Sequence, residues 1–202
     1  MTLSLDSWRS KSYPKGWMGV SLVRDMTETN LQSTDAGEGQ AHMRYTHYAQ
    51  RAKKEGFPNV SKLFTAVSFA ELVHAGNHYR NIGSKGDAVT VSKAIFGARN
   101  TTEDLQAGID GETFEIKEMY PAYKKVAEFQ VEKAAETSFT WALEAEKIHA
   151  SLYEKAKQSV DRGKDIDLGS IQICTVCGYT VKGEAPDRCP ICSAPKEKFK
   201  AF

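Results

Sequence analysis

The first 173 residues of this 202-residue chain contain no cysteine, and no apolar run approaches the roughly 18 residues that a membrane-spanning helix needs. The N-terminus also lacks the charged-then-apolar pattern of a signal peptide. Lys and Arg number 27 and Asp and Glu number 26, so the formal net charge is only +1. These absences predict a cytoplasmic protein, with no membrane association and no field that would recruit nucleic acid.

The cysteines are confined to the C-terminal tail, where two Cys-x-x-Cys pairs are separated by 11 residues. They are Cys174, Cys177, Cys189 and Cys192. In a reducing compartment this pattern favours metal ligands over disulfides. Four thiolates at this spacing predict a tetrahedral site for one iron or one zinc ion. Iron would make the site a one-electron relay and zinc would make it structural, and the spacing fits both.

Before the cysteines, apolar residues recur with helical period in four segments. The segments start at Thr29, run from about Val60 to Ile82, start near Thr101, and run from about Val131 to Val160. Pro121 lies inside the third segment, whose period continues past it, so we expect a kink and not an end. A long crossover, about residues 83–100, separates the second and third helices. This order is typical of an all-α four-helix bundle with the ferritin-like arrangement.

The predicted organisation therefore has four parts. These are an aromatic-containing N-terminal arm (residues 1–27), the bundle (28–162), a charged linker (163–170) and the four-cysteine domain (171–202).

One metal-binding pattern occurs twice in the predicted bundle. Glu71-x-x-His74 and Glu146-x-x-His149 have identical spacing, and a lone glutamate precedes each, Glu38 by 33 residues and Glu112 by 34. Glu and His three residues apart project side by side from a helix. Burying several carboxylates without a cation costs several kcal/mol each. The repeat therefore predicts a two-metal site in which each Glu-x-x-His pair supplies one bridging carboxylate and one terminal imidazole. Iron or manganese suits these ligands, with zinc as the competitor.

Glu115 breaks the repeat, because the equivalent place on the first helix is Ala41. An extra carboxylate gives one metal a second choice of ligand, which is useful if the charge of the metal changes during turnover. The other interpretation is a surface glutamate one turn from a ligand. His42 and His78 have ligand-like spacing from Glu38 and His74, but we expect them to support ligands or pack. We expect His47 to be solvated.

These motifs resemble those of the rubrerythrin family over about residues 28–202. The bundle motifs are Ala36-Gly-Glu-Gly-Gln-Ala-His-Met-Arg-Tyr45, Glu71-x-x-His74, Gly111-Glu112-x-x-Glu115 with Glu118-Met-Tyr-Pro121, and Glu146-x-x-His149. The tail from Cys174-x-x-Cys177-Gly-Tyr179 through Cys189-Pro-x-Cys192-x-Ala-Pro-Lys-Glu-Lys-Phe199 is similar to the family's rubredoxin-like domain.

The resemblance implies a non-haem di-iron peroxidase that reduces hydrogen peroxide to water, with electrons relayed through an Fe(Cys)4 site. It implies six iron ligands: Glu38, Glu71, His74, Glu112, Glu146 and His149. Glu115 would exchange with His74 on one iron as the oxidation state changes, and Tyr45 and Tyr120 would donate hydrogen bonds to ligating carboxylates. The electron donor would be rubredoxin or an NAD(P)H-dependent reductase.

The resemblance also implies a homodimer, in which one subunit's cysteine site often lies near the other's di-iron site and helix pairs are sometimes exchanged. This chain departs from the family in its longer N-terminal arm, and in Gln130-Val131 where a glycine turn is common. Two other functions fit the residues. The same helices build ferroxidases and iron-storage proteins, which have no need of an electron inlet. A structural zinc protein would be colourless, whereas ferric tetrathiolate iron absorbs visible light.

Overall fold

The computed structural model describes residues 24–84, 86–97 and 99–202. Most of the predicted N-terminal arm lies outside these residues. The first helix, α1, begins at Asp25, four residues before the predicted start at Thr29. Thr27 is buried, and its backbone N–H and hydroxyl both donate to Gln130 Oε1, at 2.9 and 2.6 Å. This long-range contact extends the helix beyond its periodic stripe.

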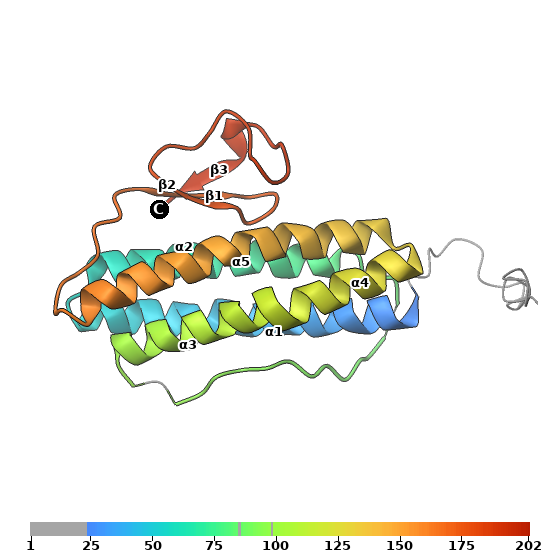
Figure 1. Cartoon of the computed structure of the whole chain (residues 1–202), viewed down its shortest axis with the longest axis horizontal. Coiled ribbons are helices and arrows are strands. Elements are labelled where there is room, and N and C mark those ends of the chain that lie inside the picture. Colours follow the sequence, from blue (N-terminus) through green and yellow to red (C-terminus); the bar gives the residue numbers. More distant parts are fainter. Residues whose placement is uncertain (1–23, 85, 98) are drawn as a thin grey trace, which may run out of the picture.

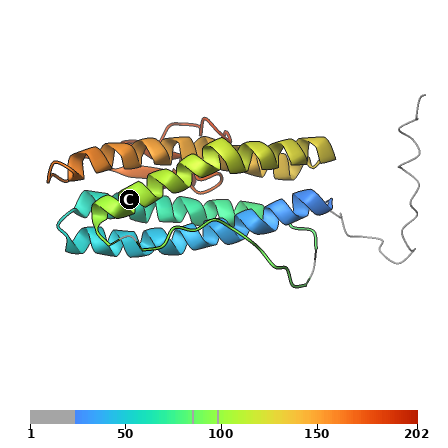
Figure 2. The ribbon, with the colours of Figure 1, turned by 60° about the horizontal axis from the view of Figure 1, so that its bottom comes forward.

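The described chain forms a four-helix bundle with a small sheet packed on one side (Figure 1). The helical elements are α1 (Asp25–Lys54), α2 (Pro58–Tyr79), α3 (Thr101–Phe114), η2 (Glu115–Met119), α4 (Tyr120–Gln130) and α5 (Lys133–Val160). Because α3, η2 and α4 follow one another without a break, they form a single rod. Figure 2 shows α1 and α2 in one layer, and the α3–α4 rod with α5 in the other. The predicted fold class is confirmed.

Local signals account for the starts of α2 and α3. Pro58 occupies the first turn of α2, where its missing N–H costs nothing. The Asn100 side chain caps α3 by accepting a hydrogen bond from Glu103 N at 2.9 Å. Pro121 does not end the third helix, as predicted, and the turn just before it is a π-helix, η2.

Two predicted boundaries are wrong. The second helix ends at Tyr79 and not at Ile82, and the fourth begins at Lys133 and not at Val131. Val131 instead closes α4 in the left-handed conformation, with φ 64° and ψ 32°. Glycine usually fills such a position, and a β-branched residue there is strained. The helical period runs through both helices, so it could not reveal this turn.

Two apolar clusters fill the bundle, one on each side of Glu38 along α1. Leu31 belongs to one and Tyr45 to the other, with Tyr45 packed among Phe64 and Tyr153. The polar residues described below therefore lie in the middle of the core.

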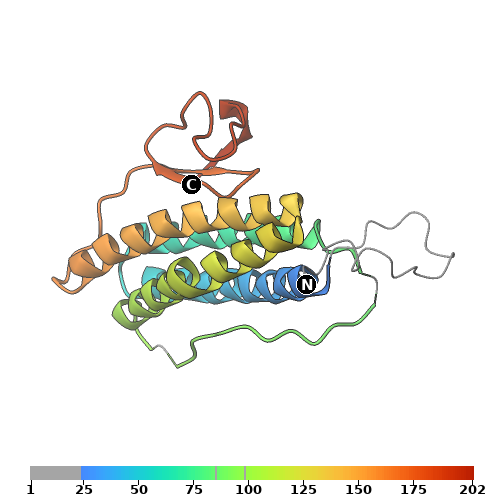
Figure 3. The ribbon, with the colours of Figure 1, turned by 45° about the vertical axis from the view of Figure 1, so that its right-hand side comes forward.

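The C-terminal sheet consists of β1 (Ile171–Cys174), β2 (Thr180–Lys182) and β3 (Phe199–Ala201), antiparallel in the order β2-β1-β3. It packs against α2 and α5 (Figure 3). The crossover before α3 runs along the opposite side of the bundle (Figures 1 and 3). Within the described residues, none of the helices is both long and apolar enough to span a bilayer.

Candidate metal centres

Four glutamates from four different rods meet in the middle of the bundle. Glu38 comes from α1, Glu71 from α2, Glu112 from α3 and Glu146 from α5, and each exposes at most 1% of its surface. Glutamate is almost never buried to this degree unless it is paired or bound to a metal. The helical stripes therefore face inward as the sequence predicts.

The four glutamates and two histidines divide into two overlapping groups. One contains Glu38, Glu71, His74 and Glu146, and the other contains Glu71, Glu112, Glu146 and His149. Within each group the ligand atoms all lie within 4.8 Å of one another. Because Glu71 and Glu146 belong to both groups, they are placed to bridge two metal ions, with one lone glutamate and one imidazole at each end.

Both imidazoles turn Nδ1 toward the carboxylates. His74 Nδ1 lies 2.9 Å from Glu71 Oε2 and 2.8 Å from Glu146 Oε1. His149 Nδ1 lies 2.6 Å from Glu146 Oε2 and 3.4 Å from Glu71 Oε1. The same nitrogen of each histidine is therefore available to a metal.

The hydrogen bonding of the glutamates indicates that a cation is needed between them. Glu38 Oε2 and Glu112 Oε2 lack a hydrogen-bond partner among the described residues, whereas the oxygens of Glu71 and Glu146 face the two imidazoles. A buried carboxylate oxygen without a donor is costly unless a cation approaches it. These oxygens and the two imidazoles form the oxygen-rich donor set that suits iron or manganese. The residues therefore fit a pair of metal ions.

The pKa values of the site indicate the same need for positive charge. Burial raises the pKa of Glu38 and Glu112 well above the usual value, and neighbouring carboxylates raise both further. Burial also opposes the charge of Glu146, but His74 and His149 outweigh it and lower that pKa. Burial disfavours the charged form of His149, but Glu146 raises its pKa to about 9. The imidazoles thus compensate Glu146 and leave Glu38 and Glu112 to a cation.

Two tyrosines hold the lone glutamates. Tyr45 OH donates to Glu112 Oε1 at 2.6 Å, and Tyr120 OH donates to Glu38 Oε1. Each tyrosine thus comes from one layer of the bundle and orients a carboxylate of the other. Both hydrogen bonds are those that the resemblance implies.

Glu115 stands apart from the two groups. It is the first residue of the π-turn and is half-buried, and it belongs to neither group of ligand atoms among the described residues. Burial raises its pKa, and the charges of Glu146 and Glu71 raise it further. Glu115 is therefore close enough to interact with the carboxylates, while His74 belongs to one of the two groups.

The three other histidines differ in environment. His47 is exposed, as expected. His42 Nδ1 lies 2.7 Å from Ser68 O and 3.0 Å from Ser68 Oγ, so it joins α1 to α2. His78 is completely buried, with Nε2 3.0 Å from Tyr120 OH and Nδ1 2.8 Å from the hydroxyl of Ser138.

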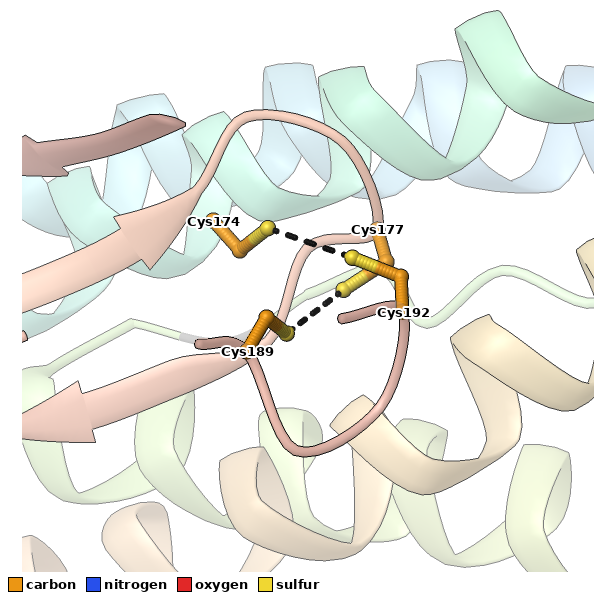
Figure 4. Close-up of side chains that lie close together, drawn as sticks. All are labelled: Cys174, Cys177, Cys189 and Cys192. Carbon is orange, nitrogen blue, oxygen red and sulfur yellow. Dashed lines mark hydrogen bonds between the residues drawn. The ribbon is translucent and has the colours of Figure 1, made fainter. Parts of the chain in front are cut away.

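The four cysteine sulfurs turn toward one another (Figure 4). Cys174 Sγ lies 3.6 Å from Cys192 Sγ, and Cys177 Sγ lies 3.5 Å from Cys189 Sγ. A disulfide requires about 2.05 Å. A tetrahedron with metal–sulfur bonds of about 2.3 Å separates its sulfurs by about 3.8 Å. The spacing therefore suits one metal ion.

Backbone amides support the thiolate form of the cysteines. A hydrogen bond from Cys177 and the amides of Val176 and Cys177 lower the pKa of Cys174 to about 5. The pKa of Cys177 is instead raised by its hydrogen bond with Cys174 and by burial, and burial raises the pKa of Cys192 to about 11, although the amides of Tyr179 and Ala194 act in the opposite direction. The amides of the two Cys-x-x-Cys turns therefore favour the thiolate form that binds a metal ion.

The segment that holds the four cysteines, residues 174–192, is called the cysteine knuckle below. It contacts His74 and His149 of the bundle directly. The hydroxyl of Thr180 lies 2.8 Å from His149 Nε2, and a Cβ on Gly178 would overlap His74 Nε2. Asn77 Nδ2 on α2 donates to Val176 O at 2.9 Å. The contact is made within one chain. Gly178 belongs to the four-cysteine motif of the sequence. Thr180 and Ser138 belong to no spaced motif, so they could not be identified from the sequence.

Comparison with known proteins agrees with both sites. Residues 29–157 match the rubrerythrin family model, and residues 172–200 match the model of the rubrerythrin rubredoxin-like domain. The chain is 44% identical to rubrerythrin-2 of Clostridium acetobutylicum, over 91% of this chain and 100% of the relative. It is 34% identical to nigerythrin of Nitratidesulfovibrio vulgaris, over 87% of this chain and 86% of the relative.

Among solved structures, fully reduced nigerythrin aligns with a TM-score of 0.74 at 32% identity, covering 92% of this chain and 91% of that one. The chain therefore belongs to the rubrerythrin family, with the family's di-iron site in the bundle and its rubredoxin-like four-cysteine site at the C-terminus.

Proposed function

We propose that this chain is a peroxidase that reduces hydrogen peroxide to two water molecules, consuming two electrons and two protons. The observation that carries the proposal is the contact of the cysteine knuckle with both imidazoles, through Gly178 at His74 and Thr180 at His149. A one-electron site placed on the ligands of a two-metal site is suited to a redox reaction that must be supplied with electrons.

We assign the ligands from the two overlapping groups. Glu38 and His74 would bind one iron, Glu112 and His149 the other, and Glu71 and Glu146 would bridge them. When bound, such a centre supplies two electrons to a peroxide O–O bond. The protein excludes bulk water and fixes the ligands, and Tyr45 and Tyr120 hold the two lone carboxylates in place.

Glu115 is the residue that we assign to a change of ligand. It would replace His74 when the charge of that iron rises, because a carboxylate balances the added charge better than a neutral imidazole. A π-turn supports this assignment, since such turns are frequent at functional sites.

Electrons would enter through an iron ion held by Cys174, Cys177, Cys189 and Cys192. The external donor would be a rubredoxin or an NAD(P)H-dependent reductase. We also propose that the chain forms a homodimer and acts in the cytoplasm.

Iron oxidation is the second candidate function, because the buried carboxylates would equally bind iron as a substrate. A ferroxidase or iron-handling protein has no need of an electron inlet, so the cysteine knuckle favours peroxide reduction. Zinc in the four-cysteine site would remove that argument, and it would leave the protein colourless.

The test is NADH-driven peroxide consumption by the iron-loaded chain with a reductase, using Cys177→Ser and, as control, the exposed neighbour Thr175→Ser. We expect the wild type and the control to turn over. We expect Cys177→Ser to keep the di-iron site but lose reductase-driven turnover. Full turnover by Cys177→Ser would contradict electron entry through the cysteine site. Iron oxidation that needs no peroxide, with no peroxide turnover, would favour the ferroxidase function.

A further inference from the structure

A line of hydrogen bonds joins Glu38 to the edge of the bundle on the side of the cysteine knuckle. Tyr120 OH donates to Glu38 Oε1, and His78 Nε2 lies 3.0 Å from Tyr120 OH. His78 Nδ1 lies 2.8 Å from Ser138 Oγ. The line therefore crosses from the centre of the core to α5 through Tyr120, His78 and Ser138.

Ser138 borders an open cleft of about 460 Å³ between α2, α5 and the knuckle. Asn77 and Arg80 line the cleft from α2, and Thr175 and Val176 line it from the knuckle. Ser138 is itself 3% exposed, whereas His78 and Tyr120 are fully buried. The outer end of the line therefore borders the cleft, whereas its middle is closed off in the core.

The bonds have one direction. His78 is completely buried and both of its ring nitrogens face neutral hydroxyl groups, so the ring is neutral and carries one proton. Tyr120 gives its single proton to Glu38, so its oxygen must accept from His78 Nε2–H. Nδ1 is then bare and accepts from the Ser138 hydroxyl. Every hydrogen in the line thus points toward Glu38.

Aromatic rings insulate the inner part of the line. The His78 ring lies 5.4 Å from that of Phe139 and 5.8 Å from that of Tyr120, centroid to centroid. The nearest charged partner of His78 is Glu38, with 4.0 Å between Nε2 and Oε1, and the charges of His74 and Glu146 also act on it. An imidazole joined on both sides by hydrogen bonds is suited to passing protons.

We propose that Ser138, His78 and Tyr120 conduct protons from the cleft to Glu38 for peroxide reduction. The inference rests on the proposed function, which consumes two protons per peroxide. Water gives a proton to Ser138 as Ser138 gives its own to His78 Nδ1. His78 gives its Nε2 proton to Tyr120, and Tyr120 gives its hydroxyl proton to Glu38. Each of the three relay groups ends with as many protons as it had, and the proton delivered to Glu38 passes to an oxygen of the cleaved peroxide.

The first test measures the tautomer of His78 by ¹⁵N NMR in the full chain loaded with zinc, which avoids the broadening caused by iron. We expect a neutral ring at pH 7 with the proton on Nε2, and a shift of the Nδ1 resonance in Ser138→Val. A proton on Nδ1, or a charged ring, would overturn the relay. This test requires no peroxide chemistry.

The second test follows proton uptake with an indicator dye after the reduced, iron-loaded chain is mixed with hydrogen peroxide. Ser138→Val and Ser138→Thr have the same shape, but only threonine keeps the hydroxyl. We expect the valine variant to take up protons about 10²-fold more slowly, the lower end of what positioned proton transfer contributes, and threonine to restore most of the rate.

Ser68→Ala is the control, because Ser68 is also a buried serine on a histidine, His42. We expect it to behave as the wild type. Equal rates in the Ser138→Val and Ser68→Ala variants would contradict the relay. If hydrogen peroxide does not oxidise the iron of the wild type, the proposed function is wrong. The role of the relay in peroxide reduction is then wrong too, whatever tautomer of His78 the NMR measurement finds.

Discussion

The two halves of the bundle, α1 with α2 and the α3–α4 rod with α5, repeat one design. Each half supplies a lone glutamate and a Glu-x-x-His pair, and each gives the other a tyrosine: Tyr45 donates to Glu112 and Tyr120 donates to Glu38. The halves are therefore interlocked at the site, so neither can form its metal site alone.

The halves differ most where Glu115 lies. Tyr45 follows Glu38 by seven positions in the chain, but Tyr120 follows Glu112 by eight. The second interval contains the π-turn Glu115–Met119, and a π-turn holds one residue more than an α-turn. The extra residue is thus absorbed locally, which keeps the tyrosines equivalent while giving one half a carboxylate that the other lacks.

The halves also differ in how their helices are joined. Gly56, with φ 88°, turns the chain between α1 and α2, whereas Val131, with φ 64°, turns it between α4 and α5. The same left-handed conformation is thus reached without strain in one half and with strain in the other.

The largest expected effect follows from the difference between shared and unshared carboxylates. Glu146 belongs to both groups of ligands and Glu38 to one. We expect Glu146→Gln to lose both di-iron metals and Glu38→Gln to lose one, because an amide carries no charge to bind a cation. Elemental analysis after dialysis measures this. The exposed Glu144→Gln is the control, and equal retention by all three would contradict the bridging geometry.

The next effect concerns the contact between the knuckle and α2. A methyl group at Gly178 would overlap His74, whereas one at Gly183 would meet nothing within 4 Å, although both residues have positive φ. We therefore expect Gly178→Ala to slow electron transfer from the cysteine site to the di-iron site by roughly 10²-fold. Gly183→Ala has the same backbone strain without the overlap, so it should transfer electrons normally. Stopped-flow spectroscopy compares the two, and equal rates would contradict the docked arrangement.

A smaller effect concerns packing in the two halves. A Cβ on Gly108 would lie 2.9 Å from the Tyr153 ring, but a Cβ on Gly39 would contact nothing within 4 Å. We expect Gly108→Ala to lower the free energy of unfolding by about 1–3 kcal/mol. Gly39→Ala should raise it by about 0.5–1 kcal/mol, because alanine favours the helix. Chemical denaturation measures both. Stabilisation by Gly108→Ala would show that α3 and α5 are not this close.

The smallest effect concerns the helix connections. We expect Val131→Gly to raise the free energy of unfolding by about 1 kcal/mol by relieving left-handed strain, and Gly56→Ala to lower it by a similar amount. Thermal denaturation of the two variants measures the pair. Destabilisation by Val131→Gly would mean that Val131 makes contacts worth more than its strain.

Most of the bundle could be predicted from sequence, and so could the glutamates and histidines that the structure brings together, Glu115 excepted, because residues at helical spacing share a face. The π-turn could not be predicted, because one extra residue leaves the helical pattern of the sequence intact. It is revealed only by the structure, in which Tyr120 contacts Glu38. The left-handed turn at Val131 could not be predicted either, because the glycine that usually indicates such a turn is absent. His78, Ser138 and Thr180 act through contacts 31 to 60 residues apart in the chain, which no local spacing encodes.

The most direct test of the central claim, that the cysteine site delivers electrons to the di-iron site without an encounter between separate molecules, is a single-turnover measurement. The fully reduced, iron-loaded protein is mixed with hydrogen peroxide, and ferric tetrathiolate absorbance is followed at several protein concentrations. We predict that the cysteine site is oxidised after the di-iron site, with a first-order rate that does not depend on protein concentration. A cysteine site that stays reduced, or a rate proportional to protein concentration, would contradict it.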